Sequence, residues 1–472
     1  MSKVLISKDK LDTLSERIKG KAGLSENLTI DEMTNVVDSL VVNDLDIDGV
    51  IKQYRVLAGE TISAGSFIEF INTITSTTTT AADNGVSCVL LEENKIFMTH
   101  GGSSDRLYGT IVTIDGTNMT FTTKTINSTS YSCYYGNPSC VLLEENKIFI
   151  AYGHNSNYTL YGAIVTINGT DMSVTTSAIG GTKSIYSTID CILLEKNKVF
   201  IAHNNYSPYC LCGTIVSIDG TTMTAVNSIL NSDSGSCNFN ASARCVLLEN
   251  NKVFIAYGYG TSSSSSARLY GTTVVIDGTT MTATHYVLKE AGYNLNYGCT
   301  GEVFGCILVG NNKVFVAYAT GSDQHLSSML VNIDGSNVST SSHTVIDSSG
   351  VYKGRSILLE NNKIFIVYSP SGGMYQLKSA FVEIDGNTIT VTKKMLNDKL
   401  YRANYNYPDC LALSDGKIFI AHHYYPANGS EQLASSIYIG DKVKNYTDKI
   451  DGVASMDGSD GALIDVVVPN VQ

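Results

Sequence analysis

Three histidines recur at one position of a repeated segment, and this is the feature of the sequence that comes closest to a metal centre. The position lies five residues after a lysine common to all repeats, and it always holds histidine or tyrosine: His100, Tyr152, His203, Tyr257, Tyr318, Tyr368 and His422. Imidazole nitrogens bind transition metals, usually together with carboxylates or thiolates. No acidic residue recurs beside these histidines. We therefore expect the position to pack between repeats, and we expect no metal.

No arrangement of residues in the sequence is typical of an enzyme active site. Seven arginines are spread along the chain, at Arg17, Arg55, Arg106, Arg244, Arg268, Arg355 and Arg402. A Gly-x-Ser-x-Gly nucleophile elbow, a His-Glu-x-x-His zinc motif and a phosphate-binding loop are all missing from the sequence. We therefore predict that the protein is not an enzyme, with no catalytic residues and no cofactor.

Six of the eleven cysteines share one slot of the repeat, seven residues before that same lysine. They are Cys88, Cys140, Cys191, Cys245, Cys306 and Cys410. Equivalent positions of successive repeats do not naturally lie within reach of a disulfide, which needs Cα atoms about 4.4–6.8 Å apart. A small buried residue explains the slot better than a disulfide framework. The cysteines therefore predict a protein that is made and folded in a reducing cytosol.

Charge and hydropathy exclude two kinds of partner. The formal net charge is −12 at pH 7, whereas binding to nucleic acid or to an anionic membrane surface needs clustered Lys and Arg. No apolar run approaches the roughly 20 residues of a membrane span, and the first residues lack the apolar core of a signal peptide. We expect neither nucleic acid nor a membrane span.

The element that must position these residues is a repeat of about fifty residues, and a Lys-[Ile/Val]-Phe triplet marks it. The triplet ends at Phe97, Phe149, Phe200, Phe254, Phe315, Phe365 and Phe419. Each unit reads as four short strands, with tight turns of the Asn-Lys, Asn-Asn or Asp-Gly type. Four antiparallel strands per unit are typical of a β-propeller blade. The sequence predicts mainly β structure: a seven-bladed β-propeller with a short α-helical N-terminal segment and small β flanks. A β-helix or a string of sandwiches is the alternative.

These patterns divide the chain into four predicted parts. They are a helical attachment segment at 1–43, a linker and β flank at 44–65, the propeller at 66–447 and a C-terminal β flank at 448–472. Two segments compete for the outer strand of the last blade. Residues 67–88 resemble the end of the first blade and can lock the two termini together, whereas residues 443–447 are the rival. We favour closure by the N-terminal segment.

Strand order assigns the connections to two faces of the ring, and tyrosines gather on one of them. In a four-strand meander the tight turns emerge on one face, and all other connections emerge on the opposite face, here called the variable face. The variable face holds the candidate ligand-binding residues Tyr134, Tyr135, Tyr206, Tyr209, Tyr293, Tyr297, Tyr405, Tyr407, Tyr424 and Tyr425. Tyrosine combines a rigid apolar ring with a hydroxyl. Varied loops on a rigid scaffold favour a recognition surface; the alternative is that the tyrosines pack locally.

The N-terminal segment carries an amphipathic pattern and a family resemblance. Leu11, Leu14 and Ile18 form one helical stripe, and residues 28–40 read as a second helix with Thr29 as N-cap. Residues 11–40 resemble the attachment segment of tail-fibre and receptor-binding proteins in phages, and in phage-tail-like bacteriocins, of Gram-positive hosts. Residues 58–71 and 449–469 resemble paired pieces of a small β module of phage virion proteins, with the propeller inserted between them. The resemblance does not extend to the propeller.

The resemblance implies a virion or tail component, and the variable face adds recognition. We expect a tail fibre or receptor-binding protein that recognises the host bacterial surface, either a glycan or a surface protein. Residues 1–43 would bind other virion or baseplate proteins, and the chain would form a homo-oligomer, with a trimer as the expected state. It would be assembled in the host cytoplasm and reside in the virion or tail-like particle. The alternatives are a structural virion protein without a specific receptor, and a glycan-cleaving propeller enzyme.

Overall fold

The structure is a computed structural model. It describes residues 49–56, 61–62, 67–81, 85–102, 106–116, 118–127, 137–154, 159–180, 189–206, 209–231, 242–249, 251–259, 267–293, 303–320, 325–335, 337–360, 362–370, 377–396, 408–424, 432–445, 452–454, 458–459 and 463–469. Strands dominate these residues, and the one helix among them is the short 3-10 helix η2 (Ser414–Gly416). No helix in this part of the chain is long and apolar enough to cross a membrane. The chain forms two compact units, residues 71–441 and residues 1–70 with 442–472.

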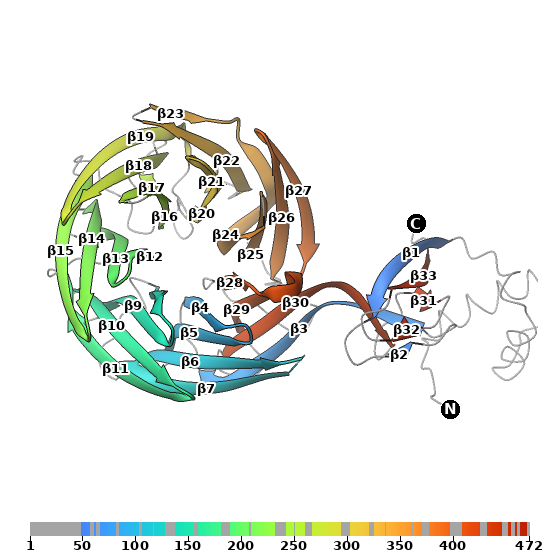
Figure 1. The fold of residues 1–472 in the computed structure, drawn as a ribbon. Coiled ribbons are helices and arrows are strands. Elements are labelled where there is room, and N and C mark those ends of the chain that lie inside the picture. Colours follow the sequence, from blue (N-terminus) through green and yellow to red (C-terminus); the bar gives the residue numbers. More distant parts are fainter. Residues whose placement is uncertain are drawn as a thin grey trace, which may run out of the picture. The chain divides into compact units, whose positions relative to one another are not determined.

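The larger unit is a ring of antiparallel sheets, and consecutive strands fill each sheet from the axis outward (Figure 1). The first group contains β4 (Val86–Glu92), β5 (Lys95–Gly102), β6 (Arg106–Asp115) and β7 (Asn118–Asn127). The second contains β8 (Ser139–Glu144), β9 (Lys147–His154), β10 (Thr159–Asn168) and β11 (Asp171–Ala178). The third contains β12 (Asp190–Glu195), β13 (Lys198–Tyr206), β14 (Tyr209–Asp219) and β15 (Thr222–Asn231). The fourth contains β16 (Ala243–Glu249), β17 (Lys252–Tyr259), β18 (Ala267–Asp277) and β19 (Thr280–Tyr293).

The next two groups share one long strand, which joins them into a single sheet. The fifth group contains β20 (Val303–Gly310), β21 (Lys313–Thr320), β22 (His325–Asp334) and β23 (Asn337–Thr340). The shared strand is β24 (Thr344–Glu360), which pairs with β22 through residues 344–350 and with β25 through residues 351–360. The sixth group is therefore β24, β25 (Lys363–Pro370), β26 (Lys378–Asp385) and β27 (Thr388–Met395). The seventh group contains β28 (Asp409–Ala412), β29 (Ile418–Tyr424) and β30 (Gln432–Asn445).

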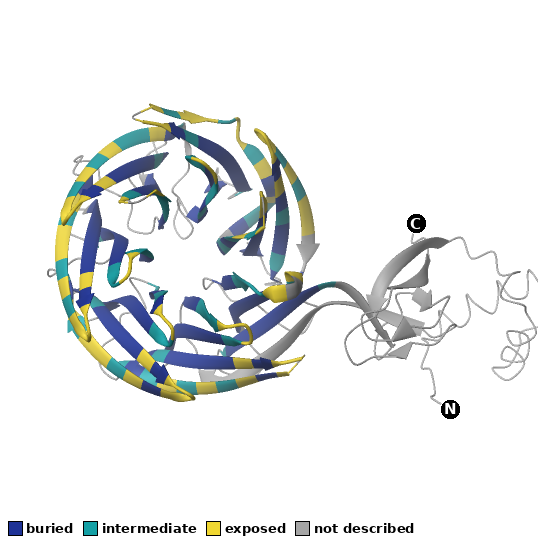
Figure 2. Cartoon of the chain, viewed as in Figure 1, coloured by how far each residue is buried: buried dark blue, intermediate teal, exposed yellow. Residues whose placement is uncertain are grey.

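The hydrophobic core lies between neighbouring sheets, and the Lys-[Ile/Val]-Phe triplets supply its centre. All seven triplet phenylalanines are fully buried. The cluster that contains Phe149 and Leu160 of the second group also contains Ile189, Val199 and Val216 of the third. A single sheet cannot bury both of its faces, so each one is covered by the next. Exposed residues alternate with buried ones mainly along the outer strands, as Figure 2 shows.

Tight turns of constant length connect the strands on one face of the ring. In the first six groups two residues separate the first strand from the second, as residues 145–146 do between β8 and β9. Asparagine with positive φ fills the second position in five of them: Asn146, Asn197, Asn251, Asn312 and Asn362. The carbonyl oxygen of each of these asparagines accepts an N–H from the third strand, as at Asn251 O from Ile276 N at 2.8 Å. The turn geometry explains why Asn recurs there, because Asn adopts positive φ more readily than most residues.

The seventh group is completed by the N-terminal strand. Gly440 has a φ of 81°, and β30 continues past it without the turn that ends the third strand elsewhere. The fourth strand is β3 (Phe67–Ala81), which pairs with β30. The predicted closure by the N-terminal segment is confirmed. Residues 443–445, which belonged to the rival segment, extend the third strand instead.

In the smaller unit, strands that precede the ring in the sequence pair with strands that follow it. Its strands are β1 (Gly49–Val56), β2 (Thr61–Ile62), β31 (Gly452–Ala454), β32 (Gly458–Ser459) and β33 (Leu463–Pro469). Strand β1 runs antiparallel to β33 from Gly49 opposite Pro469 to Arg55 opposite Leu463, and β2 pairs with β32. The segment 1–43 lies outside the described residues, so its helices and its attachment role stay predictions, as do the four domain boundaries.

Candidate functional site at the ring axis

One position of the repeat, here called the axial slot, brings polar side chains together at the centre of the ring. It is the residue before the cysteine slot, near the start of each innermost strand: Ser87, Ser139, Asp190, Arg244, Gly305, Arg355 and Asp409. The innermost strands surround the axis (Figure 1). Because each side chain comes from a different group, the slot is the place where distant parts of the chain can form one site.

At four junctions between neighbouring groups, a side chain of the axial slot accepts a backbone N–H of the next group. Ser87 Oγ accepts the N–H of Cys140 at 3.2 Å, and Ser139 Oγ accepts that of Cys191 at 3.1 Å. Asp190 Oδ2 accepts the N–H of Cys245 at 2.8 Å. Asp409 Oδ2 accepts the N–H of Cys88 at 2.8 Å, which joins the seventh group to the first. The slot therefore satisfies buried backbone donors at the junctions and helps to close the ring.

Two arginines and two aspartates of the slot form an ion-pair cluster across the axis. Arg355 donates from Nη1 to Asp190 Oδ1 at 3.1 Å, and its Nε lies 3.3 Å from Asp409 Oδ1. Arg244 Nη1 lies 3.3 Å from the same Asp190 oxygen. Through these two ion pairs, Arg355 links the sixth group to the third and to the seventh. The formal charges of the four side chains cancel.

The electrostatics of the cluster keep its carboxylate charged despite burial. Burial raises the pKa of the Asp190 carboxyl, but the guanidinium groups of Arg355 and Arg244 outweigh burial and hold that pKa below its ordinary value. Burial also lowers the pKa of Arg355, but Asp190 and Asp409 raise it above its ordinary value. Asp190 and Arg355 therefore stay ionised, as a buried pair requires for stability.

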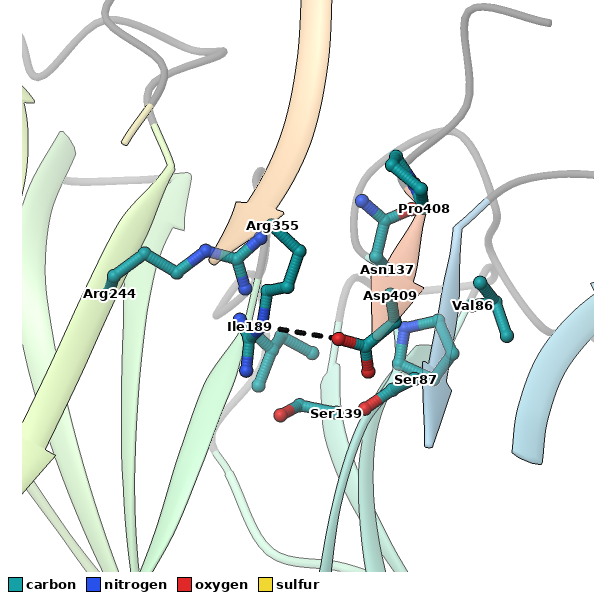
Figure 3. A pocket seen from close by; sticks show the side chains of 10 residues that line it. Val86, Ser87, Asn137, Ser139, Ile189, Arg244, Arg355, Pro408 and Asp409 are labelled. Atoms are coloured by element: carbon teal, nitrogen blue, oxygen red, sulfur yellow. Dashed lines mark ion pairs between the residues drawn. The ribbon is translucent and has the colours of Figure 1, made fainter. Parts of the chain in front are cut away.

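A small recess with room for about one water molecule lies beside this cluster. Figure 3 shows its lining side chains, with Arg355 and Asp409 facing each other across an ion pair. The lining residues are Val86, Ser87, Asn137, Pro138, Ser139, Ile189, Arg244, Arg355, Pro408 and Asp409. The recess is lined by both serines of the axial slot and by Arg244, Arg355 and Asp409 of the same slot.

The cysteine slot behaves as the sequence predicts. Cys88, Cys140, Cys191, Cys245 and Cys410 are buried, Cys306 is half-buried, and all six are free thiols. Burial raises the pKa of Cys191 to about 12, and it raises the pKa of the other five well above the ordinary value. A thiol with a raised pKa is a poor nucleophile. These cysteines therefore pack in the interior as weakly nucleophilic thiols.

The histidine and tyrosine position is also used for packing, as predicted. All seven side chains are at most 2% exposed. His100 Nδ1 donates to the Gly101 carbonyl at 3.0 Å, so its Nε2 accepts the hydroxyl hydrogen of Thr110 at 3.0 Å. Burial lowers the pKa of His100 from 6.5 to about 4, and the neighbouring His423 lowers it further against the Gly101 hydrogen bond. Histidine here is a neutral, hydrogen-bonded core residue.

Four of the ten candidate tyrosines lie at strand ends that the structure describes, and six do not. Tyr206 and Tyr209 pair across the end of β13 and β14, Tyr293 ends β19, and Tyr424 ends β29. The other six (Tyr134, Tyr135, Tyr297, Tyr405, Tyr407 and Tyr425) lie outside the described residues. The assignment of the tyrosines to a ligand therefore stays a prediction.

Sequence reasoning missed the axial slot. It treated the seven arginines as scattered, but the structure brings Arg244 and Arg355 onto one carboxylate, Asp190. The repeat alignment held a signal, because both arginines directly precede the cysteine slot. The signal was weak because the seven slot residues share no chemistry; only their position recurs.

Comparison with known proteins establishes the fold alone. No protein-family model matches the sequence, and no curated protein matches it. The BP39L lectin from Burkholderia pseudomallei is 9% identical, with a TM-score of 0.52, and the match covers 75% of this chain and 98% of the lectin. A lectin from Aleuria aurantia, described as a six-bladed β-propeller, is 10% identical over 78% of this chain and 99% of its own, with a TM-score of 0.43. A putative 6-phosphogluconolactonase from Bacteroides fragilis is 9% identical over 75% of this chain and 96% of its own, with a TM-score of 0.46. The strand pairing and the BP39L match are those of a β-propeller.

Proposed function

We propose that this protein is a non-catalytic β-propeller that binds a ligand on a bacterial surface through the variable face of the ring. One observation carries the proposal: the connections on the two faces differ in regularity. On the uniform face, two residues separate the strands in each of the first six groups, both between the first and second strands and between the third and fourth. On the variable face, residues 207–208 connect the second and third strands of one group, and residues 260–266 do so in the next. Variation restricted to one face is typical of a binding surface on a fixed scaffold.

We propose that the ring has seven blades. Seven groups of strands follow one another from β4 to β30, and β3 completes the last of them. Each group includes one Lys-[Ile/Val]-Phe triplet with a buried phenylalanine. Closure by a strand from the other terminus covers the edge of β30, which protects that edge against association.

A glycan is the ligand class that we propose. BP39L is named a lectin, and the variable-face segments of this chain are rich in Tyr, Asn and Ser, whose side chains stack on and hydrogen-bond to sugars. The chain contains no tryptophan. Tyrosine must therefore provide the stacking surface for a sugar ring.

We further propose that the protein belongs to the tail of a phage or a phage-tail-like bacteriocin. The support is the resemblance of residues 11–40, 58–71 and 449–469, together with the pairing of the two flanks into one small β unit. Residues 1–43 would attach the chain to other virion proteins as a homo-oligomer, with a trimer as the simplest expectation. Several copies on one particle would raise avidity well above the affinity of a single shallow site.

Cell binding by the full-length protein tests the proposal. Fluorescently labelled protein should bind susceptible Gram-positive cells and reduce adsorption of the particle. A variant in which the tyrosines of segments 402–409 and 422–432 are replaced by serine should lose most of this binding. A matched control replaces Asn362, which lies in a tight turn of the uniform face, by glycine and should bind normally.

Three outcomes would contradict the proposal in different ways. Undiminished binding by the tyrosine-to-serine variant would remove the case for the variable face. Antibody labelling of the particle at the head, with no binding to cells, would favour a structural virion protein. Release of saccharides from host cell walls by purified protein would favour an enzyme.

A further inference from the structure

Cys210 and Cys212 are two cysteines of the ring that lie outside the cysteine slot. They are separated by one residue in β14, and residues so spaced in a strand point to the same side of the sheet. Their Sγ atoms lie 3.5 Å apart, so one thiol donates a hydrogen bond to the other. Both thiols are reduced and buried, with 1% of Cys210 and 5% of Cys212 exposed. The structure thus holds two thiols in contact within one strand.

The packing that recurs around the ring does not explain this pair. Cys212 lies opposite His203, whereas a tyrosine lies opposite the matching residue in the first, second and fourth groups. The ring of that tyrosine lies against the histidine or tyrosine across the strands, as in His100 and Tyr108 with ring centroids 5.7 Å apart. The third group has a thiol in place of the ring. The thiol pair is therefore a feature of one group and not of the repeat.

The surroundings of Cys210 favour its thiolate. The hydrogen bond with the Cys212 thiol lowers the pKa of Cys210 below its ordinary value, against the effect of burial. The side chain of Asn205, on the paired strand β13, adds a second hydrogen bond with the same effect. The slot cysteines differ, because burial raises their pKa. Since the thiolate is the form that attacks a disulfide, Cys210 is a better nucleophile than the slot cysteines.

The strand geometry permits a bond between the two sulfurs. Two residues of a strand rise by about 6.6 Å, and disulfides join Cα atoms about 4.4–6.8 Å apart. The sulfurs must approach from 3.5 Å to about 2.05 Å, which a bend of the strand at Leu211 provides. The pairing of β14 with β15 is already irregular there, because the register shifts between Leu211 and Cys212. A bend at this point therefore interrupts no regular ladder.

We propose that Cys210 and Cys212 form a reversible disulfide, with a low-molecular-weight disulfide such as oxidised glutathione as the oxidant. The Cys210 thiolate attacks one sulfur of the oxidant and forms a mixed disulfide, and the released thiolate takes up the proton that Cys210 has lost. The sulfur of Cys212 then attacks that of Cys210, and its proton passes to the second departing thiolate. Two cysteine thiols and one small disulfide thus become one protein disulfide and two small thiols. The contact between the sulfurs favours the second step over a lasting mixed disulfide.

The position of the pair gives the disulfide a consequence for the variable face. Cys210 pairs with Asn205 near the end of the β13–β14 hairpin, and the next pair is formed by two candidate tyrosines, Tyr206 and Tyr209. A disulfide in β14 fixes that end of the hairpin. It should form outside the reducing cytosol and strengthen cell binding, because a preorganised hairpin loses less freedom on contact. This consequence rests on the proposed function, whereas formation of the disulfide does not.

A redox titration of the full-length protein tests the disulfide. Trypsin releases residues 199–244 as one peptide, so a Cys237→Ser background leaves Cys210 and Cys212 as its two cysteines. The protein is incubated with an increasing share of oxidised glutathione until labelling no longer changes. It is then unfolded, and its thiols are alkylated with one reagent before reduction and with another after it. The labels of Cys210 and Cys212 should change together, and reduction should reverse the change.

Two variants separate the two steps of the exchange. Cys212→Ser keeps a hydrogen-bond donor beside Cys210 but removes the second sulfur, so glutathione should remain attached to Cys210. Cys210→Ser leaves Cys212 without its partner thiol, and Cys212 should react with oxidised glutathione at least about tenfold more slowly than Cys210 does, since the thiol with the lowered pKa is gone. Cys191→Ser, which removes a buried thiol of the cysteine slot, is the matched control and should leave the disulfide unchanged.

The outcomes separate this proposal from the proposed function. Labels of Cys210 and Cys212 that stay unchanged in a large excess of oxidised glutathione, or that change independently, would overturn the disulfide. A Cys212→Ser variant that carries no glutathione on Cys210 would overturn it as well. These measurements need no cells, so they leave surface recognition untouched. A disulfide that forms without any effect on cell binding would remove its role at the variable face, and absence of cell binding in both redox states would contradict the proposed function alone.

Discussion

At the scale of single residues, the axial slot shows how one position of a repeat can serve two purposes. Serine and aspartate in the slot accept the same backbone N–H of the next group, so the junction is satisfied by either residue. Aspartate adds a charge that must be paired, and Arg244 and Arg355 pair it. Serine adds no charge and needs no ion pair. Variation within the slot thus determines which groups take part in the ion-pair cluster.

Asp190 is the residue on which the ion-pair cluster depends most, because it accepts from both arginines. Asp190→Asn should lower the free energy of unfolding by about 3 kcal/mol, since it leaves the buried Arg244 and the partly buried Arg355 with one carboxylate between them. The measurement is the midpoint of urea unfolding. Glu195→Gln is the matched control, because Glu195 pairs with Lys198 while 62% exposed, and it should cost less than about 1 kcal/mol. Equal effects of the two variants would show that the cluster does not stabilise the ring.

The buried histidines should make the stability depend on pH. Burial lowers the pKa of His100 and His422 from 6.5 to about 4 in the folded chain, and His423 contributes to both shifts. A lowered folded pKa means that the unfolded chain binds protons first, so the contribution is present above pH 6.5 and is lost as the pH falls toward 4. The difference corresponds to about 3 kcal/mol for each histidine at the acidic end. Carboxyl groups such as Asp190, whose pKa lies below 3.8, lose their contribution only at lower pH.

Unfolding free energies at pH 7, 6 and 5 measure this dependence. His100→Tyr should flatten it, because tyrosine fills the same position in four other groups and does not titrate in this range. A stability that stays constant between pH 7 and 5 in the wild type would contradict the assignment of neutral, buried imidazoles.

At the scale of elements, the tight turns are the part of the fold that the sequence specifies most directly. Asn251 has a φ of 63°, and its exposed side chain makes the backbone conformation the main constraint there. Asn251→Ala should destabilise the protein by about 1 kcal/mol, because a Cβ is disfavoured at positive φ. Asn251→Gly should stay within about 0.5 kcal/mol of the wild type in the same unfolding experiment, since glycine adopts this conformation without strain. A harmless alanine variant would argue against the positive φ.

The predictable part of the structure is the part that repeats. The triplet phenylalanines, the paired turns and the cysteine slot recur with the same chemistry, and the strands and the core follow from them. The pairing of β3 with β30 was also predicted, because residues 67–88 resemble the end of another unit. The axial site could not be predicted, since Ser139, Asp190 and Arg244 share a position but no property that a pattern would reveal. Their meeting depends on ring closure, which brings Arg355 to a carboxylate 165 residues away.

At the scale of the whole molecule, the ring is held closed at the junction between its last and first groups. Strand β3 completes the sheet of β28, β29 and β30, and Asp409 accepts the N–H of Cys88 across the same junction. On the uniform face Ser414 donates to Glu93 at 3.0 Å. Of these interactions, only β3 pairs along the edge of a strand, β30.

Two fragments test the importance of this strand. Residues 67–445 contain every strand of the ring and should unfold cooperatively on heating, as a single monomeric species in size-exclusion chromatography. Residues 82–445 lack β3 and expose the edge of β30, so they should melt at a lower temperature and associate. Identical melting of the two fragments would show that β3 is dispensable for closure.

The passage of the chain between its two units has a consequence for how such a protein can change over generations. The chain enters the ring through β3 and leaves it through β30, and these two strands are neighbours in one sheet. An insertion whose ends lie side by side can be exchanged without stretching or cutting its host. A recombination event that replaces residues 71–441 as a cassette needs only two compatible joins, and it leaves the pairing of β1 with β33 untouched. A lineage can therefore acquire a new ring in one step while it keeps the small unit formed by the two flanks.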